Sequence, residues 1–211
     1  FTIPANSYAF QSEDVNTITA YAILVGNTNT IDEDLGYELA RLMHEHAEEN
    51  THSQSAFITL ENALNGSEGL PIHPGAKKYY EEQGLTVNNP VAELGETEAK
   101  EEFILGTGSQ GGTYYPLGGE MATIWNRYLE NYNFTNIETG ASIENLVSIR
   151  DNGMDLGITV HAPAQDAVAG RGEFESGAID NVAFIGHIYP EVIQIVTRER
   201  SNIDSLSDLT D

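Results

Sequence analysis

The chain has 211 residues, with 33 Asp and Glu against 9 Lys and Arg, and a formal net charge of −24. A field this negative repels polyanions, so neither nucleic acid nor an anionic membrane surface is an expected partner. The sequence has no cysteine, which excludes disulfides, thiolate metal sites and a cysteine nucleophile. A surface this rich in carboxylates can be an adaptation to high salt, where screening removes the self-repulsion.

The sequence contains no signal-peptide pattern and no apolar run near the roughly 18 residues of a membrane span. We therefore expect no membrane insertion of this chain. The missing signal peptide favours a cytoplasmic protein unless the numbering begins after processing.

The first part of the chain predicts one strand, three helices and a linker. An apolar run that ends at Gly26 indicates a strand covered on both faces. A capping-box spacing from Thr30 to Glu33 and the pair Pro74 and Gly84 indicate helix ends. The predicted elements are a strand at 14–26, a helix from the capping box to about Glu49, helices at 56–64 and 74–84, and a polar, acidic linker at 86–101.

After the linker, predicted strands and helices alternate. Strands are expected at 103–106, 133–139, 155–160, 182–188 and 193–197, helices near 116–131, from Ser142 to Gly153 and at 163–169, and a helix start or turn at 205–211. Apolar strands that alternate with helices predict an α/β fold with a mainly parallel sheet flanked by helices.

The stretch from Gly106 to Gly111 joins a predicted strand to a predicted helix through small residues. Such a turn lets the backbone approach a ligand, and the N–H groups of a helix N-terminus attract anions. The stretch also matches G-x-G-x-x-G, with Glu138 as a candidate acidic residue of a dinucleotide fold, although Pro116 disturbs the helix that a pyrophosphate needs. An NAD-dependent enzyme and a tight turn without a ligand are the two alternatives.

Two more turns of small residues follow predicted strands, at 139–142 and 159–163. In a parallel sheet these turns and the first one lie at the same, carboxyl, edge. Three helix N-termini that converge on one crevice would make a carboxylate site without a basic side chain. Taken alone, Ser142 is better explained as an ordinary N-cap.

No catalytic or metal constellation stands out. His44 and His46 are two positions apart on a predicted helix, so their side chains diverge and cannot share a metal. Ser109 has no G-x-S-x-G around it and no base at a telling spacing. We expect no enzymatic activity, no cofactor and no metal.

Several stretches resemble the TAXI-type solute receptors of TRAP (tripartite ATP-independent periplasmic) transporters. GTGSQGGTYYPLGGEMATIWN, TGASIENL, NGMDLGI, IYPEVIQIV and SLSDL resemble the amino-terminal half of that family, and IPANSY, DVNTITAYAILV, DLGYELARLMHEH and LPIHPGAKKYYEEQG resemble its carboxyl-terminal part. The family's order is inverted here. The resemblance implies one lobe of a type II periplasmic-binding-protein-like fold, circularly permuted, in which segments 1–85 and 102–211 form one domain joined by the linker 86–101 and the second lobe is absent.

The resemblance further implies a periplasmic or cell-surface monomer that captures a small carboxylate, such as glutamate or 2-oxoglutarate, for a TRAP membrane permease. By position, the implied ligand-binding residues are Gly108, Ser109, Gly112, Thr113 and Tyr114 from the first turn, Ser142 and Asn145 from the second, and Val160 and His161 from the third. Val160 departs from the family pattern, which often has an amide there. A lobe that folds but has lost binding is a further alternative.

Overall fold

A computed structural model describes residues 1–96, 99–198, 200–203 and 205–208. The chain divides into two compact units, one of residues 20–190 and a smaller one of residues 1–19 and 191–211. The larger unit contains all the α-helices of the described chain.

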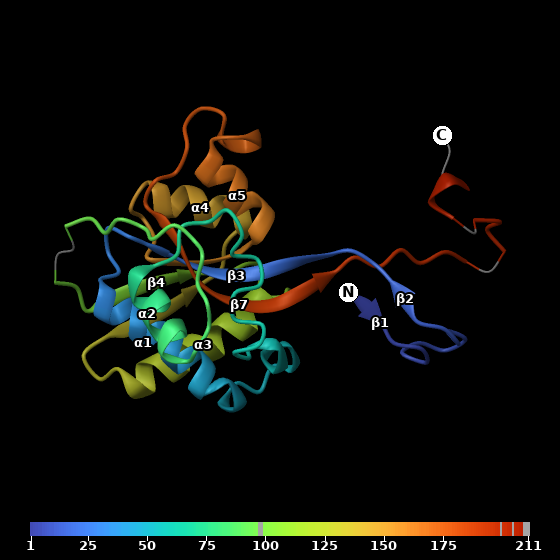
Figure 1. The fold of residues 1–211 in the computed structure, drawn as a ribbon, viewed down its shortest axis with the longest axis horizontal. Coiled ribbons are helices and arrows are strands. Elements are labelled where there is room, and N and C mark those ends of the chain that lie inside the picture. The colour runs from blue at the N-terminus through green and yellow to red at the C-terminus, as the bar shows by residue number, and fades with distance from the viewer. Residues whose placement is uncertain (97–98, 199, 204, 209–211) are drawn as a thin grey trace. The chain divides into compact units, whose positions relative to one another are not determined.

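In the described part of the chain, the main sheet has five strands in the order β5-β4-β6-β3-β7 (Figure 1). β4 is parallel to both β5 and β6, and β3 is antiparallel to β6. Hydrogen bonds from Thr28 N to Asn181 O and from Ile193 N to Ile18 O, one at each end of the pair, show that β3 and β7 are also antiparallel. The strands are β3 (Thr19–Asn27), β4 (Glu102–Gly106), β5 (Asn133–Ile137), β6 (Leu156–Val160) and β7 (Val182–Val192).

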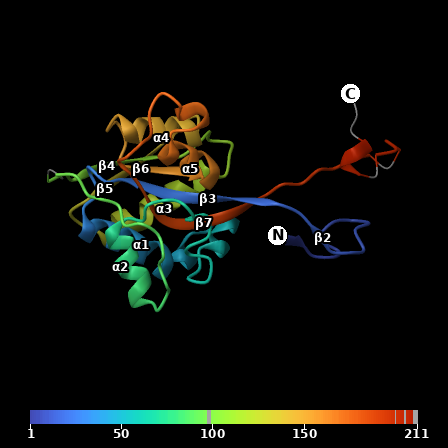
Figure 2. The same cartoon turned by 45° about the horizontal axis from the view of Figure 1, so that its top comes forward.

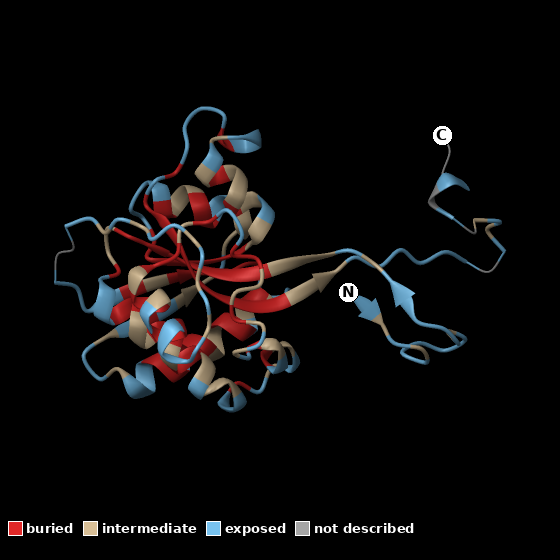
Figure 3. Cartoon of the chain, in the orientation of Figure 1, coloured by how far each residue is buried: buried red, intermediate tan, exposed pale blue. Residues whose placement is uncertain are grey.

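Helices cover both faces of this sheet. The first three, α1, α2 and α3, lie on one face, and α4 and α5 lie on the other (Figures 1 and 2). Buried residues follow the sheet and the inner sides of the helices (Figure 3). The helices are α1 (Glu33–Glu45), α2 (Pro74–Glu82), α3 (Tyr114–Tyr128), α4 (Ser142–Arg150) and α5 (His161–Ala169). This confirms the predicted α/β fold, with a mixed, mostly parallel sheet, and it matches one lobe of a periplasmic-binding-protein-like fold.

Helices α1 and α2 begin at side-chain caps. The Asp32 carboxylate accepts from Leu35 N at 2.8 Å, so the cap lies two residues after Thr30. The ring of the buried His73 accepts from Gly75 N at 3.3 Å at the start of α2. Each cap satisfies an N–H group that the first turn of a helix leaves without a partner.

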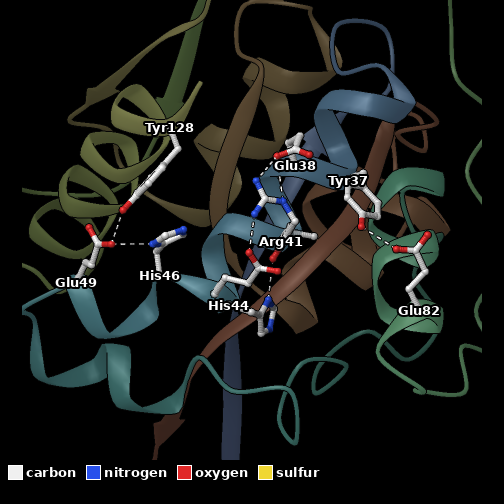
Figure 4. A network of polar contacts seen from close by, with 10 residues as sticks. Tyr37, Glu38, Arg41, His44, His46, Glu49, Glu82 and Tyr128 are labelled. Atoms are coloured by element: carbon white, nitrogen blue, oxygen red, sulfur yellow. Dashed lines mark hydrogen bonds and ion pairs between the residues drawn. The ribbon is translucent and has the colours of Figure 1, made fainter. Parts of the chain in front are cut away.

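A surface network of polar contacts ties these helices to their neighbours (Figure 4). Arg41 pairs with both Glu38 and Glu45 along α1, and the Tyr37 hydroxyl donates to Glu82 of α2 at 2.7 Å. These pairs are partly exposed to solvent, so each stabilises the fold by less than about 1 kcal/mol. The packing of α1 on α2 therefore depends on buried contacts.

Three predicted elements in the chain are wrong. Residues 56–64 are not an α-helix: a 3₁₀ helix at Ser53–Phe57 is followed by turns, because the Asn62 side chain donates to Phe57 O and competes with helical bonding. The strand predicted at 14–26 is two strands, β2 (Val15–Asn16) and β3. No strand covers 193–197, and β7 ends at Val192.

At the carboxyl end, Leu206–Asp208 forms a 3₁₀ helix. The rest of the predicted helix start at 205–211 includes residues 209–211, which lie outside the described residues.

The described residues of the segment 86–101, which are 86–96 and 99–101, follow the surface of the larger unit. Ile72 N donates to Pro90 O at 2.8 Å, and Ala92 N donates to Ile72 O at 2.9 Å. Further along, the Lys100 ammonium pairs at 2.5 Å with the carboxylate of Asp155, which is 1% exposed. Backbone bonds and an ion pair therefore hold this segment against the domain.

The smaller unit is a β-hairpin with an extended stretch beside it. β1 (Thr2–Ile3) pairs antiparallel with β2, and most of the exposed large apolar side chains of the described chain belong to this unit. A groove of about 550 Å³ is lined by residues of the hairpin and by 193–196, and none of these lining residues is charged. A two-stranded hairpin is at best marginally stable alone, and within this unit the hairpin also bonds to the extended stretch, where the Thr17 hydroxyl donates to Ile193 O at 2.7 Å.

His187 of β7 should make the fold sensitive to acid. Burial, together with the nearby His44, lowers the pKa of His187 to about 4 from 6.5, and burial also lowers the pKa of His44 and His73. Between these pH values the unfolded chain binds a proton that the folded chain does not, so the free energy of unfolding falls as the pH falls. We expect His187→Phe to reduce this slope by about 1.4 kcal/mol per pH unit, measured by urea unfolding from pH 7 to 4. An unchanged slope would contradict the burial of a neutral ring.

Candidate functional site

The turns after β4, β5 and β6 lie at one edge of the sheet, as predicted, because the three strands are parallel neighbours. Thr107, directly after β4, donates from its N–H and its hydroxyl to Ile137 O, at 3.2 and 2.7 Å. Thr139 returns a bond from its hydroxyl to Thr107 O at 3.1 Å. Val160 N, at the end of β6, donates to the Ser142 hydroxyl at 3.0 Å. Hydrogen bonds therefore join the three turns directly.

The three helices that begin at this edge share one property. Helices α3, α4 and α5 have no side-chain hydrogen bond at their N-caps, whereas α1 and α2, which begin elsewhere, do. They have 15, 9 and 9 residues, long enough for a helix dipole to act at the N-terminus. The edge thus presents three helix N-termini without side-chain caps, which favours an anion.

The first turn is packed too closely for larger residues. A Cβ on Gly106 would lie 2.2 Å from the Met154 sulfur and 2.6 Å from the amide oxygen of Asn145, and a Cβ on Gly118 of α3 would lie 2.6 Å from the Thr107 methyl group. Helix α3 can therefore begin directly against the end of β4. Gly106 of the G-x-G-x-x-G pattern and Gly118 of α3 serve this close packing, whereas a Cβ on Gly111 would meet nothing within 4 Å.

The predicted residues of the first turn lie at different depths. Gly108 is buried, and a Cβ there would be 3.5 Å from Cβ of Tyr114 and 3.6 Å from Cβ of Ala141. Tyr114 is 8% exposed, and its ring centroid lies 6.2 Å from that of Tyr189. Ser109 and Gly112 are exposed, and Thr113 is intermediate. The turn is closed by Gly112 N, which donates to Ser109 O at 2.9 Å.

Ser142 is not the N-cap of α4. Ala141 occupies that position with a φ of +68°, and its own N–H donates to the Thr139 hydroxyl. Ser142 is the first helical residue, and its oxygen accepts from Val160 N across the turn. Because the oxygen is the acceptor in that bond, the hydroxyl proton remains to be donated to another group. The predicted N-cap role of Ser142 is therefore wrong, and its hydrogen-bond partner lies at the end of β6.

Asn145 lies beneath the turns. It is 0% exposed, and its amide donates to Thr107 O at 2.9 Å and to Ile158 O at 2.8 Å. It joins the end of β4 to β6 from a position on α4. Asn145 therefore ties the first turn to β6 from below and is not exposed on the surface of the site.

His161 and Val160 end β6 and begin α5, and both are partly exposed. The His161 Nδ1 accepts from Tyr21 N of β3 at 3.1 Å. A neutral ring that accepts at Nδ1 carries its proton on Nε2, and this assigns a donor to Nε2. Sequence reasoning missed Tyr21, which lies 140 positions away and has its ring 5.5 Å from the His161 ring.

The electrostatics of the site come from dipoles and from two acids. The stretches 106–116, 138–145 and 159–166 contain no Lys or Arg. Glu138 accepts from the main chain of Gln110, and Glu144 accepts from Gly140 N at 2.6 Å. Among the described residues, no three His, Cys, Asp or Glu side chains come together in a way that could hold a metal, and no helix is long and apolar enough to cross a membrane.

A model of the NMT1-like family matches residues 1–84 and 105–211. The chain belongs to the NMT1-like family. This is a periplasmic-binding-protein-like family related to solute receptors, and at the level of the family it assigns a solute-binding role in transport, outside the cytoplasm. The match leaves out residues 85–104. No solved structure matches the chain.

Proposed function

We propose that this protein is a TAXI-type solute receptor lobe that binds a small carboxylate, such as glutamate or 2-oxoglutarate, and delivers it as a monomer to a TRAP-type permease. The observation that carries the proposal is the set of three uncapped helix N-termini at one sheet edge. In a chain with a net charge of −24, local dipoles must supply the attraction for an anion. No catalytic step is part of the proposal.

Two side chains supply further donors in this proposal. The Ser142 hydroxyl accepts from Val160 N and has a proton to donate, and His161 carries its proton on Nε2. Gly108, Ser109, Gly112, Thr113 and Tyr114 would form the first wall, with Val160 on the third turn. Asn145 would act as a positioning residue.

The proposal includes a circularly permuted order of the lobe. In the proposal, 1–84 corresponds to the later part of the family's first lobe and 105–211 to its beginning. The segment between them would connect the two, and its bonds to Ile72 and Asp155 keep it on the domain surface. A single lobe cannot close over a ligand and exclude water, so we expect a Kd of about 1 mM.

Calorimetric titration of the chain with 2-oxoglutarate, glutamate and NAD tests the proposal. We expect saturable heat from a dicarboxylate and none from NAD. Binding of NAD alone would replace the receptor with a nucleotide-dependent enzyme. If none of the three binds, the lobe is a scaffold and the proposal is wrong.

Ser142→Ala should weaken binding of 2-oxoglutarate by about 1–2 kcal/mol, or about 5- to 30-fold in Kd. The substitution removes a donor to the carboxylate and leaves Val160 N without its acceptor. Ser148→Ala, on the same helix beyond the edge, is the matched control and should leave the Kd unchanged. Equal affinities of the Ser142→Ala variant and the unsubstituted chain would remove Ser142 from the site.

A further inference from the structure

We infer that Gln110 is a carboxylate-binding residue of this site and that Glu138 occupies it at rest, so that a ligand must displace Glu138 to bind. This inference depends on the proposed function and adds to it one binding residue and an internal competitor. Gln110 of the first turn and Glu138 of the second are in contact.

Gln110 holds the Glu138 carboxylate by two hydrogen bonds. Its main-chain N–H donates to Oε1 at 3.2 Å, and its side-chain Nε2 donates to Oε2 at 3.1 Å. Each carboxylate oxygen thus receives its own N–H group from the same residue. This two-point arrangement is the one that a free carboxylate would form with the turn.

The position of the pair places it at the site. Gln110 lies in the turn that joins β4 to α3, and Glu138 directly follows β5. Both turns open at the sheet edge where α3 and α4 begin without side-chain caps. The structure therefore contains a carboxylate at the proposed carboxylate site, and that carboxylate belongs to the chain.

The hydrogen bonds between Gln110 and Glu138 can also be exchanged easily for hydrogen bonds to a ligand. Both Gln110 and Glu138 are exposed, so each can form hydrogen bonds with water when the contact opens. Exposed contacts of this kind stabilise a fold only weakly. A dicarboxylate that also reaches the Ser142 hydroxyl and the His161 Nε2 gains contacts that Glu138 alone does not make.

A purely structural role of Glu138 would have the opposite effect on the affinity for the ligand. If Glu138 only fixed the glycine-rich turn in its binding shape, its removal would loosen the turn and weaken binding. If Glu138 competes, its removal frees both N–H groups of Gln110 and strengthens binding. The sign of the change in Kd separates the two roles.

The test measures the Kd of 2-oxoglutarate by NMR titration for the unsubstituted chain, Glu138→Ala, Glu138→Gln and Gln110→Ala. Glu130→Ala, an exposed acid in the loop after α3, is the control for loss of one negative charge. We expect Glu138→Ala to bind 2-oxoglutarate about tenfold more tightly than the unsubstituted chain. The Kd of Glu138→Gln should lie between these two values, and the Kd of Glu130→Ala should equal that of the unsubstituted chain. Gln110→Ala in the Glu138→Ala background should lose the gain.

The titrations are repeated at 1 M salt, where the Debye length falls to about 3 Å and general repulsion of the ligand is screened. A gain for Glu138→Ala that persists there supports competition, and a gain that disappears overturns it. Unchanged or weaker binding by Glu138→Ala overturns the inference and leaves the receptor proposal standing. Absence of binding by every variant, including the unsubstituted chain, overturns both. The side-chain amide signals of Gln110 should also shift on Glu138→Ala without any ligand.

Discussion

Asn145→Asp should destabilise the chain by about 3 kcal/mol or more and abolish carboxylate binding, although it changes only one side-chain group. The Asn145 amide donates to Thr107 O and Ile158 O at 2.9 and 2.8 Å from a fully buried position. An aspartate there places acidic oxygens against two carbonyl oxygens, and burial of an unpaired charge is strongly unfavourable. Because these carbonyls belong to the first turn and to β6, the site should lose its shape with the fold.

Urea unfolding at pH 7 measures the first effect, and titration with 2-oxoglutarate below the unfolding transition measures the second. Asn131→Asp, in the exposed loop between α3 and β5, adds the same charge outside the three turns of the site. It should shift the free energy of unfolding by less than about 0.5 kcal/mol. If both variants have similar stability, Asn145 does not hold the first turn against β6.

Gly75→Ala should destabilise the chain by about 3 kcal/mol, at the upper end of the range for overpacked positions. A Cβ at Gly75 would lie 2.0 Å from Glu33 O and 2.4 Å from Tyr37 N, both main-chain atoms of α1. Main-chain atoms of a helix cannot rotate away as a side chain can, so α1 and α2 must move apart. Their packing covers one face of the sheet.

Gly177→Ala is the matched control for that substitution. A Cβ at Gly177 would meet nothing within 4 Å, and its φ is not positive. The control should be neutral or slightly stabilising, since alanine restricts the unfolded chain. Thermal unfolding of both variants checks the difference, and equal unfolding temperatures would show that α1 and α2 do not pack as described.

The sequence predicted the α/β order and the shared edge of the three turns. Apolar runs such as 103–106 indicate strands, and the crossover rule places the carboxyl ends of parallel strands together. Helix ends were predicted where the cap is local, as at Pro74 and Gly84 of α2. These features depend on residues that are close together in the chain, so one sequence is enough to predict them.

The features that were missed depend on residues far apart in the chain. The His161 ring takes its proton position from Tyr21, and Asn145 bonds to carbonyls of two different strands. Neither pairing leaves a spacing pattern. The Ser142 hydroxyl was assigned to its own helix because a serine before a helix usually caps it, whereas its partner is Val160 on the neighbouring strand.

The most direct test of the account is an NMR map of the backbone amides during titration with 2-oxoglutarate. We expect the largest shifts in three separate stretches, 107–114, 139–143 and 160–162, which meet only at the carboxyl edge of the sheet. Shifts confined to the uncharged groove lined by the hairpin and 193–196, or shifts in one of the three stretches alone, would contradict a carboxylate site built from three helix N-termini.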